Sequence, residues 1–563
     1  MKKYYLVVTL LFSLSCPFTT IAQNLLWAKS AGSAFNDIGH AIKVDASGNV
    51  YTTGTFQGTV DFDAGAGTYN LTSSGDDDIY ILKSDPTGNF IWAKKFGGGG
   101  LDHVFSMILD QSGNVYTMGT FLGTVDFDPG TSTCNLSSAG MDDAFISKLD
   151  TAGNFIWAKS WGSTDQDEAF AAALDYSGNV YVTGDYFGTV DFDPGTANYN
   201  LTAAGGYDIF ILKLDANGNF SWVKSMGGPI WDFALSVAID GSGNVYTIGY
   251  FDGTADFDPG TSTYNLTSAG NYDVVISKLD ASGNFVWADR IGGSDVDYGF
   301  EVTADVAGNV FIAGEFKGTA DFDPGTGVNN LTSQGTYDMF ICKLDNAGNL
   351  GWVKSISGTL VEYVNSMSLD ADGNIYSTGY FQGTTDFDPG TGTTNVTATG
   401  DDDIFICKLD ASGNLIWVKN IGGDGNDIGV GMTLDADKNI YVTGYFTETV
   451  DFDPEATTYE LTSSGGLDAF QMKVGNANQT GIHETSGSIG EVTIYPNPGQ
   501  GFFHVACQHV IDELKITNGF GQTVHQFHPN NNTCDFFVLE KGMYFIQISS
   551  GGSRVTKKIV VGY

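Results

Sequence analysis

Gly123-Thr-Val-Asp-Phe-Asp-Pro-Gly-Thr131 occurs seven times in near-identical form along this chain of 563 residues. The Asp-Phe-Asp triplets begin at Asp61, Asp126, Asp191, Asp256, Asp321, Asp386 and Asp451, always 65 residues apart. A unit of this size cannot bury its apolar face alone, so seven equal units predict a radially repeated fold. Positions that recur every 65 residues are called columns below and are named after their first member.

Each repeat is expected to contain four main strands and no helix. In one unit the expected strands span residues 89–94, 104–110, 115–121 and 143–150. The quoted stretch forms a hairpin of its own between the last two, because Pro129-Gly130 suits the central positions of a type II turn. Four strands per unit and seven units predict an all-β fold, a seven-bladed β-propeller.

The two ends of the repeat array are complementary. The segment Asn24–Lys29 matches the outermost strand of a unit, whereas the seventh unit supplies no such strand after Gly475. We therefore expect the N-terminal strand to pair with residues 468–475, closing the last blade and hiding two sheet edges.

The net charge indicates which partners are favoured, and the two ends of the chain indicate the domain organisation. The formal net charge of −41 argues against nucleic acid, and it favours cations, basic partners or solubility. A basic start and a short apolar run predict a signal peptide over residues 1–22, with no transmembrane segment. We expect the propeller at 23–478, a polar linker at 479–490 and a small C-terminal β-sandwich at 491–563.

Two family resemblances add to this interpretation. The repeat has a Gly-Asn-Phe-Ile-Trp strand, an Asp-x-Ser-Gly-Asn-Val-Tyr-x-Thr-Gly stretch and an Asp-x-Phe-Ile-x-Lys-Leu-Asp strand. In these it resembles the SBBP repeats of bacterial surface and secreted propellers, a family that implies no single activity. The C-terminal segment closely resembles the type A sorting domain of the Por, or type IX, secretion system of Bacteroidota. The matching residues are Tyr495, Pro496, Asn497, Pro498, Gly542, Tyr544, Lys557 and Lys558.

The second resemblance implies a route and a destination. It implies recognition by the type IX secretion machinery and export through the outer membrane. Release or attachment at the outer cell surface follows, so a secreted or surface location is expected.

The paired hairpin aspartates are candidate calcium ligands. Two aspartates two residues apart on a strand point to the same side, and Asp143 can supply a third oxygen to the pair Asp126 and Asp128. The alternative is that the pairs cap turns and solvate an exposed hairpin, and the sequence leaves both open. The candidate ligands are Asp61, Asp63, Asp126, Asp128, Asp191, Asp193, Asp256, Asp258, Asp321, Asp323, Asp386, Asp388, Asp451 and Asp453.

Strand order places four acidic columns, those of Asp37, Asp61, Asp63 and Asp78, at one end of every blade. Loops that differ between repeats lie at the same end, and their apolar members are candidate partner-binding anchors. Drift in unconstrained loops is the alternative. The candidate anchors are Phe35, Leu101, Trp231 and Leu360.

These features predict a secreted or cell-surface, non-enzymatic propeller that binds a protein or glycan partner through one acidic face. A calcium-stabilised structural or adhesive surface protein is the first alternative, and an extracellular hydrolase is the second. A glycosidase needs two carboxylates in unlike environments, whereas the acids here are expected to belong to repeated columns.

Overall fold

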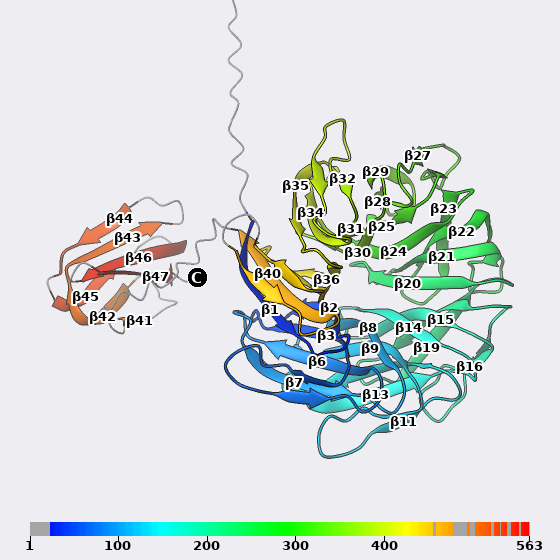
Figure 1. The fold of residues 1–563 in the computed structure, drawn as a ribbon, viewed down its shortest axis with the longest axis horizontal. Coiled ribbons are helices and arrows are strands. Elements are labelled where there is room, and N and C mark those ends of the chain that lie inside the picture. The colour runs from blue at the N-terminus through cyan, green and yellow to red at the C-terminus, as the bar shows by residue number, and fades with distance from the viewer. Residues whose placement is uncertain are drawn as a thin grey trace, which may run out of the picture. The chain divides into compact units, whose positions relative to one another are not determined.

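Every regular element of the described chain is a β-strand, as predicted (Figure 1). The computed structural model describes residues 23–453, 458–476, 492–495, 502–518, 523–529, 531–537, 542–550 and 553–561. Residues 23–475 form one compact unit, and the described residues from 492 onward belong to a second. The expected signal peptide, the expected linker and Pro496, Asn497 and Pro498 lie outside the described residues. Within the described part of the chain, no helix could span a membrane.

Seven antiparallel sheets each have a first strand at one edge, followed by a second, a third and a fourth strand. In two of them the fourth strand also pairs with a hairpin, so the sheet has six strands. The first strands are β2 (Ile38–Val44), β8 (Asp102–Leu109), β14 (Glu168–Leu174), β20 (Asp232–Ile239), β24 (Asp297–Ala304), β30 (Glu362–Leu369) and β36 (Ile428–Leu434). The second strands are β3 (Val50–Phe56), β9 (Val115–Phe121), β15 (Val180–Tyr186), β21 (Val245–Asp256), β25 (Val310–Phe316), β31 (Ile375–Phe381) and β37 (Ile440–Phe446). The third strands are β6 (Asp78–Ser84), β12 (Asp143–Leu149), β18 (Asp208–Leu214), β22 (Asn265–Leu279), β28 (Asp338–Leu344), β34 (Asp403–Leu409) and β40 (Asp468–Asn476). The fourth strands are β7 (Phe90–Phe96), β13 (Phe155–Trp161), β19 (Phe220–Met226), β23 (Phe285–Gly293), β29 (Leu350–Gly358) and β35 (Leu415–Ile421).

The seventh sheet takes its fourth strand from the start of the chain. Strand β1 (Gln23–Ala31) is hydrogen-bonded to β40, the strand with which the sequence predicts it to pair. The first strand of each sheet lies beside the first strands of the preceding and following sheets, and β36 lies beside β2 (Figure 1). These seven first strands therefore surround the middle of the unit.

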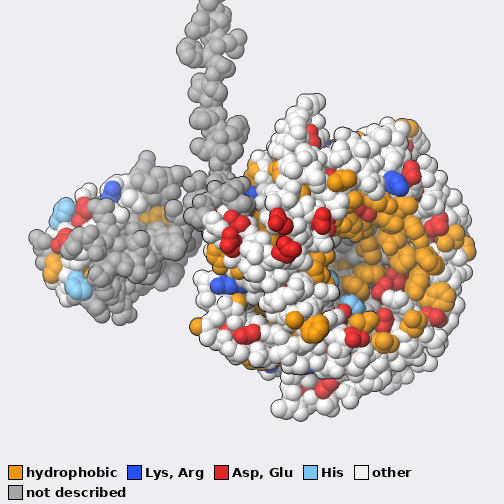
Figure 2. Space-filling model, viewed as in Figure 1, with side chains coloured by type: hydrophobic (Ala, Val, Ile, Leu, Met, Phe, Trp, Pro, Cys, Tyr) orange, Lys and Arg blue, Asp and Glu red, His pale blue; other side chains and the backbone are white. Residues whose placement is uncertain are grey.

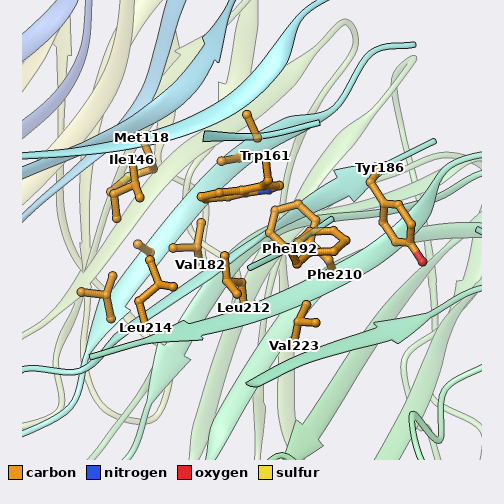
Figure 3. Packing of buried hydrophobic residues seen from close by; sticks show 14 of the residues in the cluster. Met118, Ile146, Trp161, Val182, Tyr186, Phe192, Phe210, Leu212, Leu214 and Val223 are labelled. Carbon is orange, nitrogen blue, oxygen red and sulfur yellow. The ribbon is translucent and has the colours of Figure 1, made fainter. Parts of the chain in front are cut away.

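The hydrophobic core lies between consecutive sheets. One cluster joins Met118, Ile146 and Trp161 of one sheet to Phe210 of the next sheet and to Phe192 (Figure 3). Phe192 is the phenylalanine of an Asp-Phe-Asp triplet, and its ring centroid lies 5.1 Å from that of Phe210. The triplet therefore turns its phenylalanine into packing, as expected from strand alternation.

The glycine held in every second strand is required by a close backbone approach. At Gly119, a Cβ atom would collide with the carbonyl oxygen of His103 on the neighbouring first strand. The register between β8 and β9 shifts at Val104 and Ser106, which is the bulge that this glycine predicts.

The hairpins of the quoted stretch are shorter than predicted. In one repeat β10 (Thr124–Asp126) pairs with β11 (Asn135–Ser137), so Asp128 lies beyond the strand. The cause is local: the amide of Asp128 donates a 3.1 Å hydrogen bond to Oδ1 of Asp126, which turns the chain early. The other separate hairpins are β4 (Thr59–Asp61) with β5 (Asn70–Thr72), β16 (Thr189–Asp191) with β17 (Asn200–Thr202) and β38 (Thr449–Asp451) with β39 (Glu460–Thr462). The hairpins of β26 (Thr319–Asp321) with β27 (Asn330–Thr332) and of β32 (Thr384–Asp386) with β33 (Asn395–Thr397) extend the sheets of the preceding repeats, because β26 pairs with β23 and β32 pairs with β29. In the fourth repeat the hairpin continues β21 and β22.

The C-terminal unit has two antiparallel sheets. The first contains β41 (Val492–Tyr495), β42 (Phe502–Ile511) and β45 (Asn531–Phe537). The second contains β44 (Thr523–Phe527), β43 (Glu513–Asn518), β46 (Gly542–Ser550) and β47 (Ser553–Val561). Buried side chains of β42, β43 and β46, such as Phe503, Leu514 and Ile546, form one cluster between the two sheets.

Candidate functional site

The hairpin aspartates use part of their hydrogen-bonding capacity to hold the turn. Oδ1 of Asp126 accepts the amides of Asp128 (3.1 Å) and Cys134 (2.8 Å), and Oδ1 of Asp128 accepts the amide of Gly130 (2.8 Å). The pairs that begin at Asp61, Asp191, Asp256, Asp321 and Asp386 repeat this arrangement. Asp451 likewise accepts the amides of Asp453 and Tyr459. Turn formation therefore accounts for these carboxylates without an ion.

The structure does not bring the expected third ligand to the pair. Asp143 is buried and accepts the amide of Ala139 instead. Across the described residues, no three or more His, Cys, Asp or Glu side chains form a group that could hold a metal ion. Calcium at the hairpin pairs stays a prediction.

Two of the four acidic columns expected on the displayed face are buried. All seven members of the Asp37 column and all seven of the Asp78 column belong to the interior. Hydrogen bonds from loop amides stabilise these carboxylates in the interior. Oδ2 of Asp102 accepts the amide of Gly98 at 2.7 Å, and Oδ1 of Asp37 accepts the amide of Gln57 at 3.0 Å. The displayed acidity of this face is therefore lower than the sequence predicts.

Burial makes Asp102 and Asp37, two of these inward carboxyls, difficult to ionise. Burial raises the pKa of Asp102 to about 7, and the neighbouring Asp78 adds to the rise. Burial likewise raises the pKa of Asp37 to about 6, and Asp468 adds to it. In each case one member belongs to the third strand of a sheet and the other to the first strand of the next.

The four predicted anchors are exposed and lie beside the hairpins. The ring of Phe35 lies 2.9 Å from where a Cβ atom on Gly58 would be, and Leu360 lies 3.1 Å from the same point on Gly383. Leu101 and Trp231 are exposed in the equivalent loops, and Trp231 packs edge-on against Tyr207 with ring centroids 6.3 Å apart. Trp231 thereby connects this loop surface to a second group of aromatic rings.

A cavity of about 740 Å³ lies in the middle of the unit and is lined by the first strands of all seven repeats. The space-filling view shows a hollow there, with hydrophobic side chains gathered on one side of it and acidic side chains among them (Figure 2). Lys43 and Glu301 line it and are the charged members of columns otherwise made of small or apolar residues. Burial raises the pKa of Glu301 to about 7, while Lys43 acts to lower it.

An unbroken series of aromatic contacts follows one side of the cavity. We call it the aromatic arc, and its half-buried members are Tyr207, Phe233, Tyr250, Tyr272, Tyr298, Phe300, Tyr337, Tyr363 and Tyr380. Phe300 and Tyr363 stack with centroids 4.5 Å apart, although they belong to different sheets. Both also line the cavity, so the arc is continuous with it.

Two buried carboxyls lie among these rings. Burial raises the pKa of Glu315 to about 8, and Glu315 in turn helps to raise the pKa of Tyr298 and of Tyr337. Burial also raises the pKa of Asp185 well above its usual value, and neither of its carboxyl oxygens has a hydrogen-bond partner. Burial thus favours the uncharged form of both groups, and an uncharged carboxyl can donate as well as accept hydrogen bonds.

This region is not apparent from the loops that differ between repeats, because its residues lie mainly in the strands. The arc occupies columns that change character along the chain: Asp77, Asp142, Tyr207, Tyr272, Tyr337, Asp402 and Leu467 are one of them. The expectation that all acids belong to repeated columns is also wrong, because Glu168, Asp185, Glu301 and Glu315 do not. The change from acidic to aromatic residues within such a column is the sequence feature that indicates the aromatic arc.

Some residues of the predicted sorting motif lie in the described strands. Tyr495 ends β41 and pairs with His504, while Gly542 and Tyr544 begin β46. Lys557 and Lys558 lie in β47, opposite Ile546 and Phe545. The pairing of β46 with β47 therefore brings two parts of the motif onto adjacent strands.

Comparison with known families confirms the sorting domain. Residues 493–562 match the family of secretion system C-terminal sorting domains. Such a domain implies interaction with the type IX machinery and supports a secreted or cell-surface protein.

Two curated proteins resemble parts of the chain. An uncharacterized WD repeat-containing protein of Acanthamoeba polyphaga mimivirus is 25% identical over 75% of this chain and 36% of its own length. The regulatory protein FlaEY of Caulobacter vibrioides is 24% identical over 33% of this chain and 19% of its own length. The chain thus spans about a third and about a fifth of these relatives.

Solved structures show distant similarity. A protein of unknown function from Bacteroides caccae is 10% identical, with a TM-score of 0.30 over 62% of this chain and 92% of its own. PorZ, a surface component of the type IX secretion system of Porphyromonas gingivalis, is 11% identical, with a TM-score of 0.18 over 95% and 99%. TM-scores this low do not establish a shared fold.

Proposed function

We propose that this protein is a secreted or surface-attached, non-enzymatic β-propeller that binds an extracellular glycan at the aromatic arc. A closed seven-bladed ring is supported by the strict repeat of 65 residues and by seven sheets built on four strands each, two of which are extended by a hairpin. The contact of β36 with β2 and the pairing of β1 with β40 support closure. The C-terminal domain provides the route to the surface.

The aromatic arc is the observation that carries the glycan proposal. Seven of its nine rings are tyrosines, which combine a flat apolar face with a hydroxyl tip. Sugars present the matching combination of apolar ring faces and hydroxyl groups. Uncharged Glu315 supplies a further donor and acceptor beside the rings, and Asn365 lies in the adjoining cavity. Pockets of this kind, aromatic with few polar groups, are typical of ligand sites.

A protein partner that binds the neighbouring loop surface is the second candidate. It is favoured by the exposed side chains of Phe35, Leu101, Trp231 and Leu360, which border the hairpins. Large exposed apolar side chains are typical anchors of protein interfaces.

Hydrolysis is less favoured by the positions of the carboxyls. Glu168 and Asp185 are cross-strand partners in unlike surroundings, an arrangement that resembles a glycosidase pair. However, Asp185 is fully buried, and a nucleophile or acid must reach its substrate. Binding without turnover is therefore the better interpretation.

A glycan array with the mature chain from Gln23 onward tests the proposal. We expect Tyr298→Ala and Phe300→Ala to weaken glycan binding at least about tenfold, since each removes a stacking face. Tyr176→Ala is the matched control, because Tyr176 is exposed and outside the arc. Melting curves identify variants that fail to fold. If the wild-type chain binds no glycan, or if both arc variants bind like the wild type, the proposal fails. Sensitivity to Trp231→Ala and Leu360→Ala in a surface-protein array favours the second candidate, and release of reducing ends favours hydrolysis.

A further inference from the structure

Seven pairs of buried carboxylates lie at the junctions between consecutive sheets. Each pair joins a third-strand aspartate to the first-strand acid of the next sheet, and within each pair one group helps to raise the other's pKa. The pairs are Asp468 with Asp37, Asp78 with Asp102, Asp143 with Asp167, Asp208 with Asp232, Asp273 with Asp297, Asp338 with Glu362 and Asp403 with Asp427. Two like charges taken out of water together are unfavourable unless something neutralises them.

The pair of Asp208 and Asp232 is the least satisfied. Their exposed fractions are 3% and 0%. Each uses Oδ2 to accept one loop amide, that of Ala204 at 2.9 Å and that of Gly228 at 2.7 Å. Oδ1 of both side chains is buried and has no hydrogen-bond partner. This junction therefore holds two oxygens that need a positive charge or a donor.

The chain supplies its own cation at two other junctions. Nζ of Lys95 lies 2.6 Å from Oδ2 of Asp78, and Nη1 of Arg290 lies 2.5 Å from Oδ2 of Asp273. Lys95 and Arg290 belong to one column, whose other members are Ser30, Ser160, Ser225, Ser355 and Asn420. The same structural position thus carries a positive charge in two repeats and a small or neutral side chain in five.

The loop glycines let the carboxylates pack directly against the backbone at the junction. A Cβ atom on Gly292 would lie 2.8 Å from Oδ2 of Asp297 and 2.9 Å from Oδ1 of Asp273, so both carboxylates contact the same glycine. In the Asp208 junction the corresponding point on Gly227 lies 2.6 Å from Oδ1 of Asp208. The carbonyl oxygen of Thr254 adjoins the next glycine, Gly228. Asp208, Asp232 and the carbonyl oxygen of Thr254 therefore all adjoin the loop of Gly227 and Gly228.

We propose that the junction of Asp208 and Asp232 binds a calcium ion, and that Lys95 and Arg290 replace such an ion at their own junctions. Oδ1 of the two aspartates and nearby backbone carbonyls are the protein ligands, and water completes the six to eight oxygens that calcium takes. Carboxylate and carbonyl oxygens select calcium over softer metals. This inference is independent of the glycan proposal, because no member of the aromatic arc takes part.

Calorimetry and melting of the metal-stripped mature chain test the proposal. We expect calcium to bind and to raise the melting temperature by several degrees, because a ligand that binds only the folded state stabilises it. Asp208→Asn with Asp232→Asn is expected to lose one bound equivalent and part of that shift. Ser225→Lys is expected to lose the same equivalent, because the lysine imitates Lys95. Asp193→Asn, in the hairpin of the same repeat, is the matched control and is expected to change neither quantity.

Crystals soaked in terbium, a calcium substitute, give the location directly. We expect an anomalous peak between Asp208 and Asp232 and none between Asp78 and Asp102, where Lys95 is present. The proposal is overturned if neither Ser225→Lys nor the double variant changes calcium stoichiometry. It is also overturned if calcium leaves the melting temperature unchanged while acid alone raises it, since the pair then shares a proton. A loss confined to Asp193→Asn would assign the ion to the hairpins and overturn it as well.

Discussion

The hydroxyl of Thr385 donates a 2.7 Å hydrogen bond to Oε1 of Glu362. Each of the two is the exception in its column. Glu362 replaces an aspartate, and Thr385 is the polar member of a column made of valine and alanine. The longer carboxyl reaches past the position of the aspartates, and the threonine hydroxyl meets it there. Oε2 of Glu362 has no hydrogen-bond partner, so the hydroxyl of Thr385 provides much of the hydrogen bonding of this buried carboxyl.

Thr385→Val should therefore destabilise the protein by about 2 kcal/mol, because it removes a partner from a buried carboxyl. Adding Glu362→Asp to this variant restores the residues found in other repeats and should recover part of the loss. Urea unfolding of the two single variants and the double variant measures the coupling. Purely additive effects would contradict a direct dependence between the two residues.

The buried carboxyls should make the protein more stable in mild acid than at neutral pH. Burial raises the pKa of Asp102, Asp232 and Asp297 from 3.8 to about 7. Between pH 4 and 7 the folded state therefore binds more protons than the unfolded state, and the free energy of unfolding falls as pH rises. In chelator, the urea midpoint should be higher at pH 5 than at pH 8.

Aspartates in surface turns do not alter the comparison of the urea midpoints at pH 5 and pH 8. Although burial opposes it, hydrogen bonds from Asn89 and Thr87 lower the pKa of Asp85 to about 2. The stability from such turns is present above pH 4 and lost only on further acidification. Asp102→Asn should flatten part of the slope, and a midpoint that is equal or higher at pH 8 would refute the prediction.

Lys95→Met should destabilise the protein by about 2 kcal/mol, because it leaves the buried carboxylate of Asp78 without its cation. The neighbouring substitution Lys94→Met is the control, since Lys94 is half-buried on the same strand and has no ion pair with Asp78. Chemical denaturation at pH 8 compares the two variants. If both variants lose the same free energy of unfolding, the loss comes from side-chain packing and not from the missing charge.

Glu448→Gly should stabilise the protein by about 0.5–1 kcal/mol. Glu448 has a φ of 56° at a position where the other six repeats have glycine, and this backbone conformation disfavours any residue with a Cβ atom. The converse change, Gly188→Ala, should destabilise by a similar amount, because nothing lies within 4 Å of the new Cβ atom and only backbone strain is added. Thermal unfolding gives the melting temperatures of both variants. Shifts of the same sign in the two melting temperatures would contradict the prediction.

Features that repeat in the sequence were predictable, and features made between repeats were not. The pairing of β1 with β40 follows from a strand present at one end and missing at the other, and the inward Phe192 follows from strand alternation. The burial of Asp102 was not predictable, because aspartate usually indicates a surface or a turn. Its environment exists only where two sheets meet. The stacking of Phe300 on Tyr363 likewise requires the arrangement of sheets around the middle, which no local pattern specifies.

The pairing of the first strand with the last sheet also has a temporal consequence. The hydroxyl of Tyr459 donates to the carbonyl of Ala28, a residue 431 positions earlier, and β1 lies beside β40 in the same sheet. Strand β1 therefore cannot pair until β40 has been synthesised, and contacts so remote in sequence form slowly. In a growing chain the edge of β1 stays unpaired, so the seventh sheet is completed only after the final repeat has become available.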